Sequence, residues 1–286
     1  MCELSVTAVT VAVAGRRGVR CTFPCVARRR VDTLLAERGL SPSRTSAAAS
    51  VREGRVRVGS GGARANKPGQ LVAPDIELTV DEPRRYVSRG GIKLENALAA
   101  LELDPSERDC LDVGASTGGF TDCLLRHGAA RVIALDVAQG MLDWGLRNDP
   151  RVHVVERANA RELDPAELPW TPSLATIDVS FISLAIVLPA VLVCADSRFD
   201  CLGMVKPQFE LGRERVGKGG VVRDPQARRD ALLAVARDAA DRGLAVRGFA
   251  PSGLPGPKGN RETFVWCALR GPGLSDLSSA VAGVDV

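Results

Sequence analysis

Residues 110–120 read Cys-Leu-Asp-Val-Gly-Ala-Ser-Thr-Gly-Gly-Phe, a short apolar run that ends in a glycine-rich turn. This pattern predicts a strand that leads into a helix, because glycine lets the backbone approach a ligand and the next helix closely. The spacing Gly114-x-x-x-Gly118 departs from Gly-x-Gly-x-x-Gly, and the turn lacks the Lys-Ser/Thr of a phosphate-binding loop. The turn therefore indicates a nucleotide-like cofactor and disfavours both a dinucleotide and a triphosphate.

Strand and helix patterns alternate around this turn. Predicted strands cover residues 110–113, 131–136, 152–155, 175–179, 201–205 and 263–269, and predicted helices cover residues 94–103, 120–126, 182–193 and 227–242. Such alternation favours a mostly parallel sheet with helices on both faces. We therefore expect an α/β, Rossmann-like, doubly wound domain.

A smaller unit of different pattern precedes this domain. Helical apolar spacing starts at Val31, and a second predicted helix over residues 44–52 stops at Gly54. Strict alternation over residues 55–59, and the stretch Ile-Glu-Leu-Thr-Val over residues 76–80, predict strands. Together these short elements predict a small α+β domain.

A polar, proline-containing segment separates the two patterns. We interpret residues 83–90 as a linker between the small domain, residues 28–82, and the large domain, residues 91–272. Residues 273–286 are expected to form a flexible tail. Residues 1–27 show no pattern that continues into the small domain, so we expect them to be disordered or to lie before the true start of translation.

The charge is spread unevenly along the chain. Residues 28–89 carry 13 Lys or Arg against 7 Asp or Glu, whereas residues 90–286 carry a net charge of −4. A basic unit attached to a mildly acidic body suits a polyanionic partner, and arginines scattered over ordinary surface are the alternative interpretation.

Composition indicates a cytoplasmic protein. Apolar residues make up 45% of the chain, but no apolar run approaches the length of about 18 residues that a membrane span needs. The eight cysteines form no Cys-x-x-Cys pair or Cys/His cluster. We predict small buried thiols at Cys110, Cys123, Cys194 and Cys267 in a reducing cytosol, with neither disulfides nor zinc.

Polar residues follow several of the predicted strands, where an alternating fold places its chemistry. Asp136 ends the second strand, where a carboxylate accepts hydrogen bonds from a ribose; capping the next helix is the alternative. Asn159 follows the third strand and is a candidate for contact with an adenine. Lys93, Asp178, Lys206 and Glu262 stand in segments bordered by glycine or proline. Four such residues together suggest a catalytic group.

The motifs Ser88-Arg-Gly-Gly-Ile-Lys-Leu, Asp178-Val-Ser-Phe-Ile-Ser and Val205-Lys-Pro-Gln-Phe-Glu, with the glycine-rich turn, resemble the TlyA family. Its members are ribosomal RNA 2′-O-methyltransferases, often labelled haemolysins, with an FtsJ-like catalytic domain. The resemblance implies a catalytic Lys-Asp-Lys-Glu tetrad at Lys93, Asp178, Lys206 and Glu262. It also implies S-adenosylmethionine as cofactor, bound by Asp112, Gly114, Ser116, Thr117, Gly118, Gly119, Asp136 and Asn159, and no metal.

The small domain resembles the RNA-binding module of a ribosomal small-subunit protein. The resemblance rests on the Arg-Val-Asp…Arg-Gly-Leu-x-x-Ser-Arg pattern, the Gly54-x-Val56-x-Val58 strand and the turn at Lys67-Pro-Gly. It makes five arginines candidates for phosphate contacts, with plain surface as the alternative for each: Arg30, Arg44, Arg52, Arg55 and Arg57.

The tetrad fits methylation of a ribose 2′-hydroxyl, which must lose its proton as it attacks the methyl group. Lys206 is the candidate base or steering group, since a second nearby cation favours the neutral form of a lysine. Asp178 and Glu262 would orient the two lysines. The resemblance implies cytidine in ribosomal RNA or ribosomal subunits as substrate, and we expect a monomer with no membrane partner. The alternatives are an RNA-binding assembly factor with little catalysis and a membrane-active haemolysin.

Overall fold

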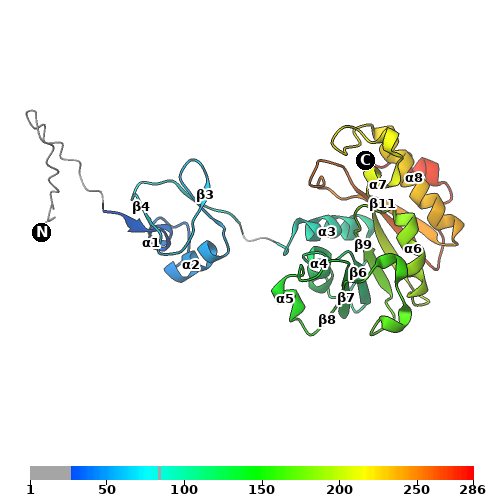
Figure 1. Cartoon of the computed structure of the whole chain (residues 1–286), viewed down its shortest axis with the longest axis horizontal. Helices are drawn as coiled ribbons and strands as arrows, with labels where there is room; N and C mark the ends of the chain where they lie inside the picture. Colours follow the sequence, from blue (N-terminus) through cyan, green and yellow to red (C-terminus); the bar gives the residue numbers. More distant parts are fainter. Residues whose placement is uncertain (1–26, 83–84) are drawn as a thin grey trace, which may run out of the picture. The chain divides into compact units, whose positions relative to one another are not determined.

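The computed structural model describes residues 27–82 and 85–286. The chain divides into two compact units, residues 1–83 and residues 84–286, which are described separately (Figure 1). The prediction for the N-terminal extension falls on residues 1–26, which lie outside the described residues, and on residue 27.

The first unit is a small α+β domain built on one apolar cluster. Its elements are β1 (Arg29–Arg30), α1 (Val31–Glu37), α2 (Arg44–Arg52), β2 (Val56–Val58), β3 (Ala63–Arg64), β4 (Leu71–Val72) and β5 (Leu78–Val80). Strands β3, β2 and β5 form an antiparallel sheet, and β1 pairs with β4. Ser43 caps α2 by accepting a hydrogen bond from the Ser46 amide. Val31, Leu35 and Val56 are fully buried in the core between helices and sheet.

The second unit is built on a seven-stranded sheet. Its strands are β6 (Asp109–Val113), β7 (Arg131–Asp136), β8 (Val152–Glu156), β9 (Leu174–Ile177), β10 (Asp200–Val205), β11 (Ala245–Pro251) and β12 (Thr263–Ala268). The spatial order is β11-β12-β10-β9-β6-β7-β8, in which β12 runs antiparallel to both neighbours and the other pairs are parallel. The doubly wound, mostly parallel sheet predicted from the sequence is thus confirmed.

Helices cover both faces of this sheet. They are α3 (Arg89–Leu101), α4 (Gly119–Arg126), α5 (Trp144–Arg147), α6 (Leu184–Val193), α7 (Pro207–Glu210), α8 (Pro225–Asp241) and α9 (Leu277–Ala282), with short 3-10 helices η1 (Ala160–Glu162), η2 (Pro165–Glu167) and η3 (Arg213–Arg215). Side chains of α3, α4 and α5 share one apolar cluster with the sheet, and those of α6, α8 and α9 share the other (Figure 1). Parallel strands need this double cover because both of their faces are apolar.

Two predicted boundaries differ from the structure. The expected flexible tail contains helix α9, and Val281 and Val286 are buried in the core. Removing these apolar side chains from water stabilises the folded chain, so the segment packs against the domain. The expected linker is shorter than predicted, since Tyr86 is buried and α3 begins at Arg89. A Cβ atom on Gly91 would lie 2.3 Å from the Tyr86 ring, so this glycine permits the close contact.

The predicted buried thiols are confirmed for Cys110, Cys123, Cys194 and Cys267. Among the described residues, no helix is both long and apolar enough to span a membrane.

Candidate active site

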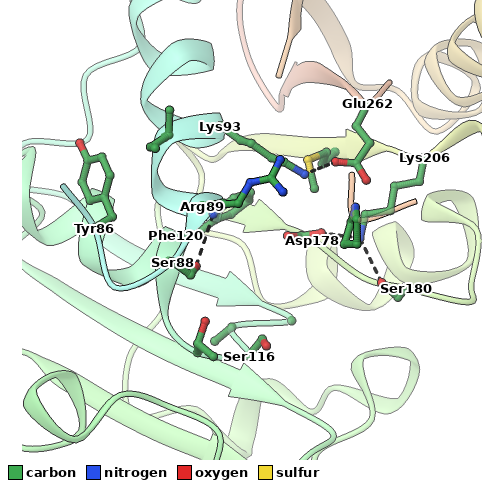
Figure 2. A pocket seen from close by; sticks show the side chains of 18 of the residues that line it. Tyr86, Ser88, Arg89, Lys93, Ser116, Phe120, Asp178, Ser180, Lys206 and Glu262 are labelled. Atoms are coloured by element: carbon green, nitrogen blue, oxygen red, sulfur yellow. Dashed lines mark hydrogen bonds and ion pairs between the residues drawn. The ribbon is translucent and has the colours of Figure 1, made fainter. Parts of the chain in front are cut away.

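A cavity of about 760 Å³ lies at the carboxyl ends of β6, β9 and β10 (Figure 2). Its wall is made by the turn after β6, the first turns of α3, the ends of β9 and β10, and the loop before β12. The residues that line it include Ser88, Arg89, Lys93, Gly114, Ser116, Thr117, Gly119, Asp178, Ser180, Lys206 and Glu262. The parallel strands end at the same edge of the sheet, so residues distant in sequence meet there.

The turn after β6 approaches the neighbouring strand too closely for any side chain. Gly114 has a φ of +86°, and a Cβ atom there would lie 2.4 Å from the carbonyl oxygen of Asp178. Its amide donates to the carbonyl of Leu135. Gly118 has a φ of +93° and packs against Leu142 and Leu146, where a side chain would not fit. It does not line the cavity. Gly114 therefore exposes its backbone to the cavity, whereas Gly118 allows the turn to pack against Leu142 and Leu146.

The first lysine–carboxylate pair joins α3 to the loop before β12. Lys93 lies in the second turn of α3, and its Nζ contacts Oε2 of Glu262. Glu262 is only 4% exposed, and the two residues are 169 positions apart in the chain. A buried carboxylate is stable only with such a partner, so each side chain holds the other in place.

The second pair lies at the ends of adjacent strands. Lys206 follows β10 and Asp178 follows β9, and Lys206 Nζ lies 2.5 Å from Asp178 Oδ1. The same Nζ donates a hydrogen bond of 3.1 Å to Oγ of Ser180 (Figure 2). Lys206 is 7% exposed, and Pro207 begins α7 directly behind it. The ammonium group is therefore fixed by two polar partners at the cavity wall.

A smaller recess adjoins the cavity through Ala115 and Ser116. Asp136 lines this recess at the end of β7 and accepts hydrogen bonds of 2.7 Å from the amides of Ser116 and Ala138. Glu156, at the end of β8, lines it as well. The recess is thus lined by the glycine-rich turn and by the acidic residues that end β7 and β8.

Comparison with known proteins agrees with this architecture. The model of the FtsJ-like methyltransferase family matches residues 86–269, and that of the S4 domain matches residues 29–75. The 16S/23S rRNA (cytidine-2′-O)-methyltransferase TlyA of Mycobacterium tuberculosis (strain ATCC 25618 / H37Rv) is 50% identical over 257 residues, which cover 87% of this chain and 95% of that protein. The chain belongs to the TlyA family of FtsJ-like methyltransferases.

Proteins named as haemolysins are similar to this chain over most of its length. Hemolysin A of Brachyspira hyodysenteriae is 36% identical over 234 residues, which cover 82% of this chain and 97% of that protein. A solved structure from Streptococcus thermophilus that carries the hemolysin label is 39% identical with a TM-score of 0.67, covering 90% of this chain and 96% of that one. The resemblance drawn from the motifs is thus confirmed.

Asp112 does not reach the cavity of this TlyA-family chain, contrary to the expectation that it binds the cofactor. Its side chain is 0% exposed inside the sheet, where it accepts hydrogen bonds from the hydroxyl groups of Thr121 (2.7 Å) and Thr176 (3.2 Å). Burial raises its pKa to about 7, and the nearby charge of Asp178 adds to the effect. Asp112 therefore supports the turn from within the sheet.

Asn159 lines neither the cavity nor the recess. Its side chain accepts a hydrogen bond from the amide of Arg161 and donates one to Glu162, so it caps η1. Asparagine suits a helix N-cap for this reason, and the predicted adenine contact is not supported by its position.

Most of the five candidate arginines of the first unit also hold its fold together. Arg30 and Arg44 bind the buried carboxylate of Asp32, and the hydrogen bonds from Arg30 do most to lower the pKa of Asp32 to about 2. Arg55 binds Glu53 and Arg57 binds Asp81. Arg52 ends α2 on the exposed side, and none of the ion pairs among the described residues includes it.

Sequence reasoning missed two residues that line the cavity and an aromatic pair that does not. Ser180 contacts Lys206, and Arg89 lies at the mouth, where it donates to the carbonyl of Pro255. Phe181 is 89% exposed with a φ of +65°, and its ring packs 5.2 Å from that of Phe209. Each phenylalanine stands three residues after a tetrad member, a spacing visible in the sequence, but only the fold shows that their rings meet.

Proposed function

We propose that this chain transfers a methyl group from S-adenosylmethionine to the 2′-hydroxyl of a cytidine in ribosomal RNA. The observation that carries the proposal is the meeting of two lysine–carboxylate pairs, Lys93–Glu262 and Lys206–Asp178, at one cavity, with both lysines buried. Two ammonium groups held at a cavity suit chemistry in which a hydroxyl loses its proton. The named activity of the Mycobacterium tuberculosis relative is the same reaction.

The residues of the cavity and recess fit the proposed cofactor. The small residues of the turn, 114–119, suit close approach of a bulky ligand to the backbone, and Asp136 at the end of β7 suits a ribose diol. We assign cofactor contacts to Gly114, Ser116, Thr117, Gly119 and Asp136, with Gly118 shaping the turn. When bound, S-adenosylmethionine supplies a methyl group on a positively charged sulfur, open to displacement.

Lys206 directs the attacking hydroxyl in this proposal. Its Nζ is held between Asp178 and Ser180 and faces the cavity, so it hydrogen-bonds the 2′-oxygen or, when neutral, takes its proton. Asp178 and Ser180 restrict the ammonium to one position. Alignment of the reacting atoms supplies most of the acceleration in a simple displacement.

Lys93 and Glu262 form another part of the cavity wall. Glu262 neutralises Lys93 and Asp178 neutralises Lys206, so the two pairs add no net positive charge that would repel the methyl donor.

The first unit is proposed to hold the RNA. It matches the S4 domain and carries an excess of basic residues, and phosphate contacts supply much of the affinity for nucleic acid. We propose ribosomal RNA or ribosomal subunits as partners, encountered in the cytoplasm by a monomer.

The test is transfer of labelled methyl groups from S-adenosylmethionine to purified ribosomal subunits and to free ribosomal RNA, followed by mapping of the labelled nucleotide. The proposal predicts label on a cytidine 2′-oxygen. Label on a base, or no label on either subunit or free RNA, would overturn it.

A further inference from the structure

Residues 212–223, here called the basic hairpin, follow α7 and have no part in the chemistry proposed above. They include the cations Arg213, Arg215, Lys218 and Arg223 against the single anion Glu214. Arg215 is neutralised by Asp230 at 2.6 Å. The side chains of Arg213, Lys218 and Arg223 are exposed, and none of them joins an ion pair among the described residues.

The tip of the hairpin projects into solvent with a defined backbone. A β-bridge joins Gly217 to Val221, and the Gly220 amide donates to the carbonyl of Gly217. Gly219 and Gly220 have φ angles of +82° and +78°, and a Cβ atom at either position would meet nothing within 4 Å. The turn therefore presents Lys218 on a structured but uncovered loop.

Asn260 fastens the base of the hairpin to the wall of the active site. This residue is 3% exposed, and its side chain accepts a hydrogen bond from the Val222 amide (2.9 Å) and donates one to the Gly220 carbonyl (2.8 Å). Its own carbonyl accepts from the Gly256 amide, in the loop whose Pro255, Pro257 and Glu262 line the cavity. The hairpin is thus tied to the wall that carries a tetrad residue.

Further cations gather at the base of the hairpin. Arg228 donates to the carbonyl of Arg223 at 3.1 Å. Burial and the neighbouring charge of Arg261 lower the pKa of Arg228. Arg261 itself pairs with Asp285 at 3.4 Å. The exposed hairpin cations that join no ion pair among the described residues, Arg213, Lys218 and Arg223, favour an anionic occupant.

We propose that the basic hairpin binds phosphate groups of the RNA strand next to the nucleotide held in the cavity. The inference rests on the proposed function and deepens it, because a nucleotide that enters a cavity must leave its flanking phosphates at the rim. Arg213, Lys218 and Arg223 supply the contacts, and Asn260 keeps them in register with the active site.

The test compares three variants of the full chain. The first, Arg213→Ala/Lys218→Ala/Arg223→Ala, removes the free cations. A matched control, Arg151→Ala/Arg198→Ala/Arg270→Ala, removes three exposed arginines near the amino ends of the parallel strands, away from the cavity. The third, Arg213→Lys/Lys218→Arg/Arg223→Lys, keeps the charge. Each is assayed with free ribosomal RNA between about 50 and 200 mM salt.

For the first variant we expect a several-fold higher KM for RNA, a salt dependence of binding weaker by about 2 in the log–log slope, and unchanged affinity for S-adenosylmethionine. The control and the charge-preserving variant should behave like the natural chain.

An unchanged KM and slope would overturn the proposal. So would a defect seen only with assembled subunits and not with free RNA, which would indicate an acidic protein as the occupant. If the natural chain methylates no RNA, the proposed function fails, whereas the salt slope of RNA binding still decides the hairpin.

Discussion

The two lysines of the site are both buried, and each depends on one carboxylate. Removing a carboxylate leaves an unpaired buried cation, which costs roughly 3–5 kcal/mol, so variants of Asp178 or Glu262 confound folding with catalysis. Variants of the lysines are cleaner. Asp178 keeps partial exposure and tolerates the loss of Lys206 better than Glu262 tolerates the loss of Lys93.

Lys206→Met keeps the length of the side chain and removes its amine. Because Nζ is the group proposed to direct the 2′-hydroxyl, we expect the rate of methyl transfer to fall by about 10²–10⁴. Affinity for S-adenosylmethionine, measured by calorimetry, should stay within a few-fold. Lys258→Met, at an exposed lysine in the loop before β12, is the control. A rate within tenfold of the natural chain, with intact binding, would remove Lys206 from its proposed role.

Phe181 combines an exposed aromatic ring with a left-handed backbone, which costs free energy in a residue with a side chain. Its position beside Asp178 suits stacking on a base. Stacking contributes about 1–3 kcal/mol per base, so Phe181→Ala should raise the KM for RNA roughly tenfold. Steady-state kinetics with saturating cofactor check this. Ile186→Ala, at another exposed apolar side chain, should have no such effect; equal effects of both variants would count against a specific stacking role.

At the scale of elements, strand β6 carries the turn and is itself stabilised by a buried carboxyl group. Asp112 links β6 to Thr176 on β9 and to Thr121 on α4. These bonds fix the strand and helix on either side of the turn. The cost is a carboxyl group that loses its proton only with difficulty.

The raised pKa of Asp112 gives stability a pH dependence of known sign. The folded-state pKa is about 7 against 3.8 for an ordinary aspartate, so the contribution of this group is fully present below about pH 4 and is lost as the pH rises to 7. Between pH 5 and 8 the free energy of unfolding should fall by about 2–3 kcal/mol relative to Asp112→Asn.

Urea titrations followed by tryptophan fluorescence measure this difference in the second unit alone, since all three tryptophans, Trp144, Trp170 and Trp266, lie there. Parallel stability curves for the two proteins would show that Asp112 titrates normally.

At the scale of the whole molecule, cofactor binding is assigned to the second unit, and most of the affinity for RNA is assigned to the first. The described residues that line the cavity, from Arg85 to Glu262, belong to the second unit, whereas the excess of basic charge lies largely in the first. Each unit also has its own apolar core.

A shortened chain of residues 84–286 should therefore keep its affinity for S-adenosylmethionine within a few-fold and lose most of its affinity for ribosomal RNA. Its RNA binding should also depend less steeply on salt, because fewer phosphates are contacted. Calorimetry and filter binding measure the two affinities. Cofactor binding that disappears with the first unit would show that the separation is wrong.

Local pattern in the sequence was enough to predict most elements. Helix α2 was predicted at its observed bounds, since Ser43 caps it and Gly54 follows its end. The five parallel strands were also predicted, because apolar runs and glycine-rich turns act over a few residues. Strand β11 was missed, since Ala245–Pro251 contains a glycine and a proline and shows no clear alternation.

The sequence by itself determined the fold class and the family, because these depend on short motifs, and the same motifs predicted the four residues of the proposed tetrad. Only the tertiary structure decided which lysine meets which carboxylate, and that Phe181 meets Phe209. It also decided that Asp112 and Asn159 turn away from the cavity, and that four of the five candidate arginines hold the first unit together. The physical reason is that burial and pairing depend on neighbours brought together by the fold, and no local pattern encodes those neighbours.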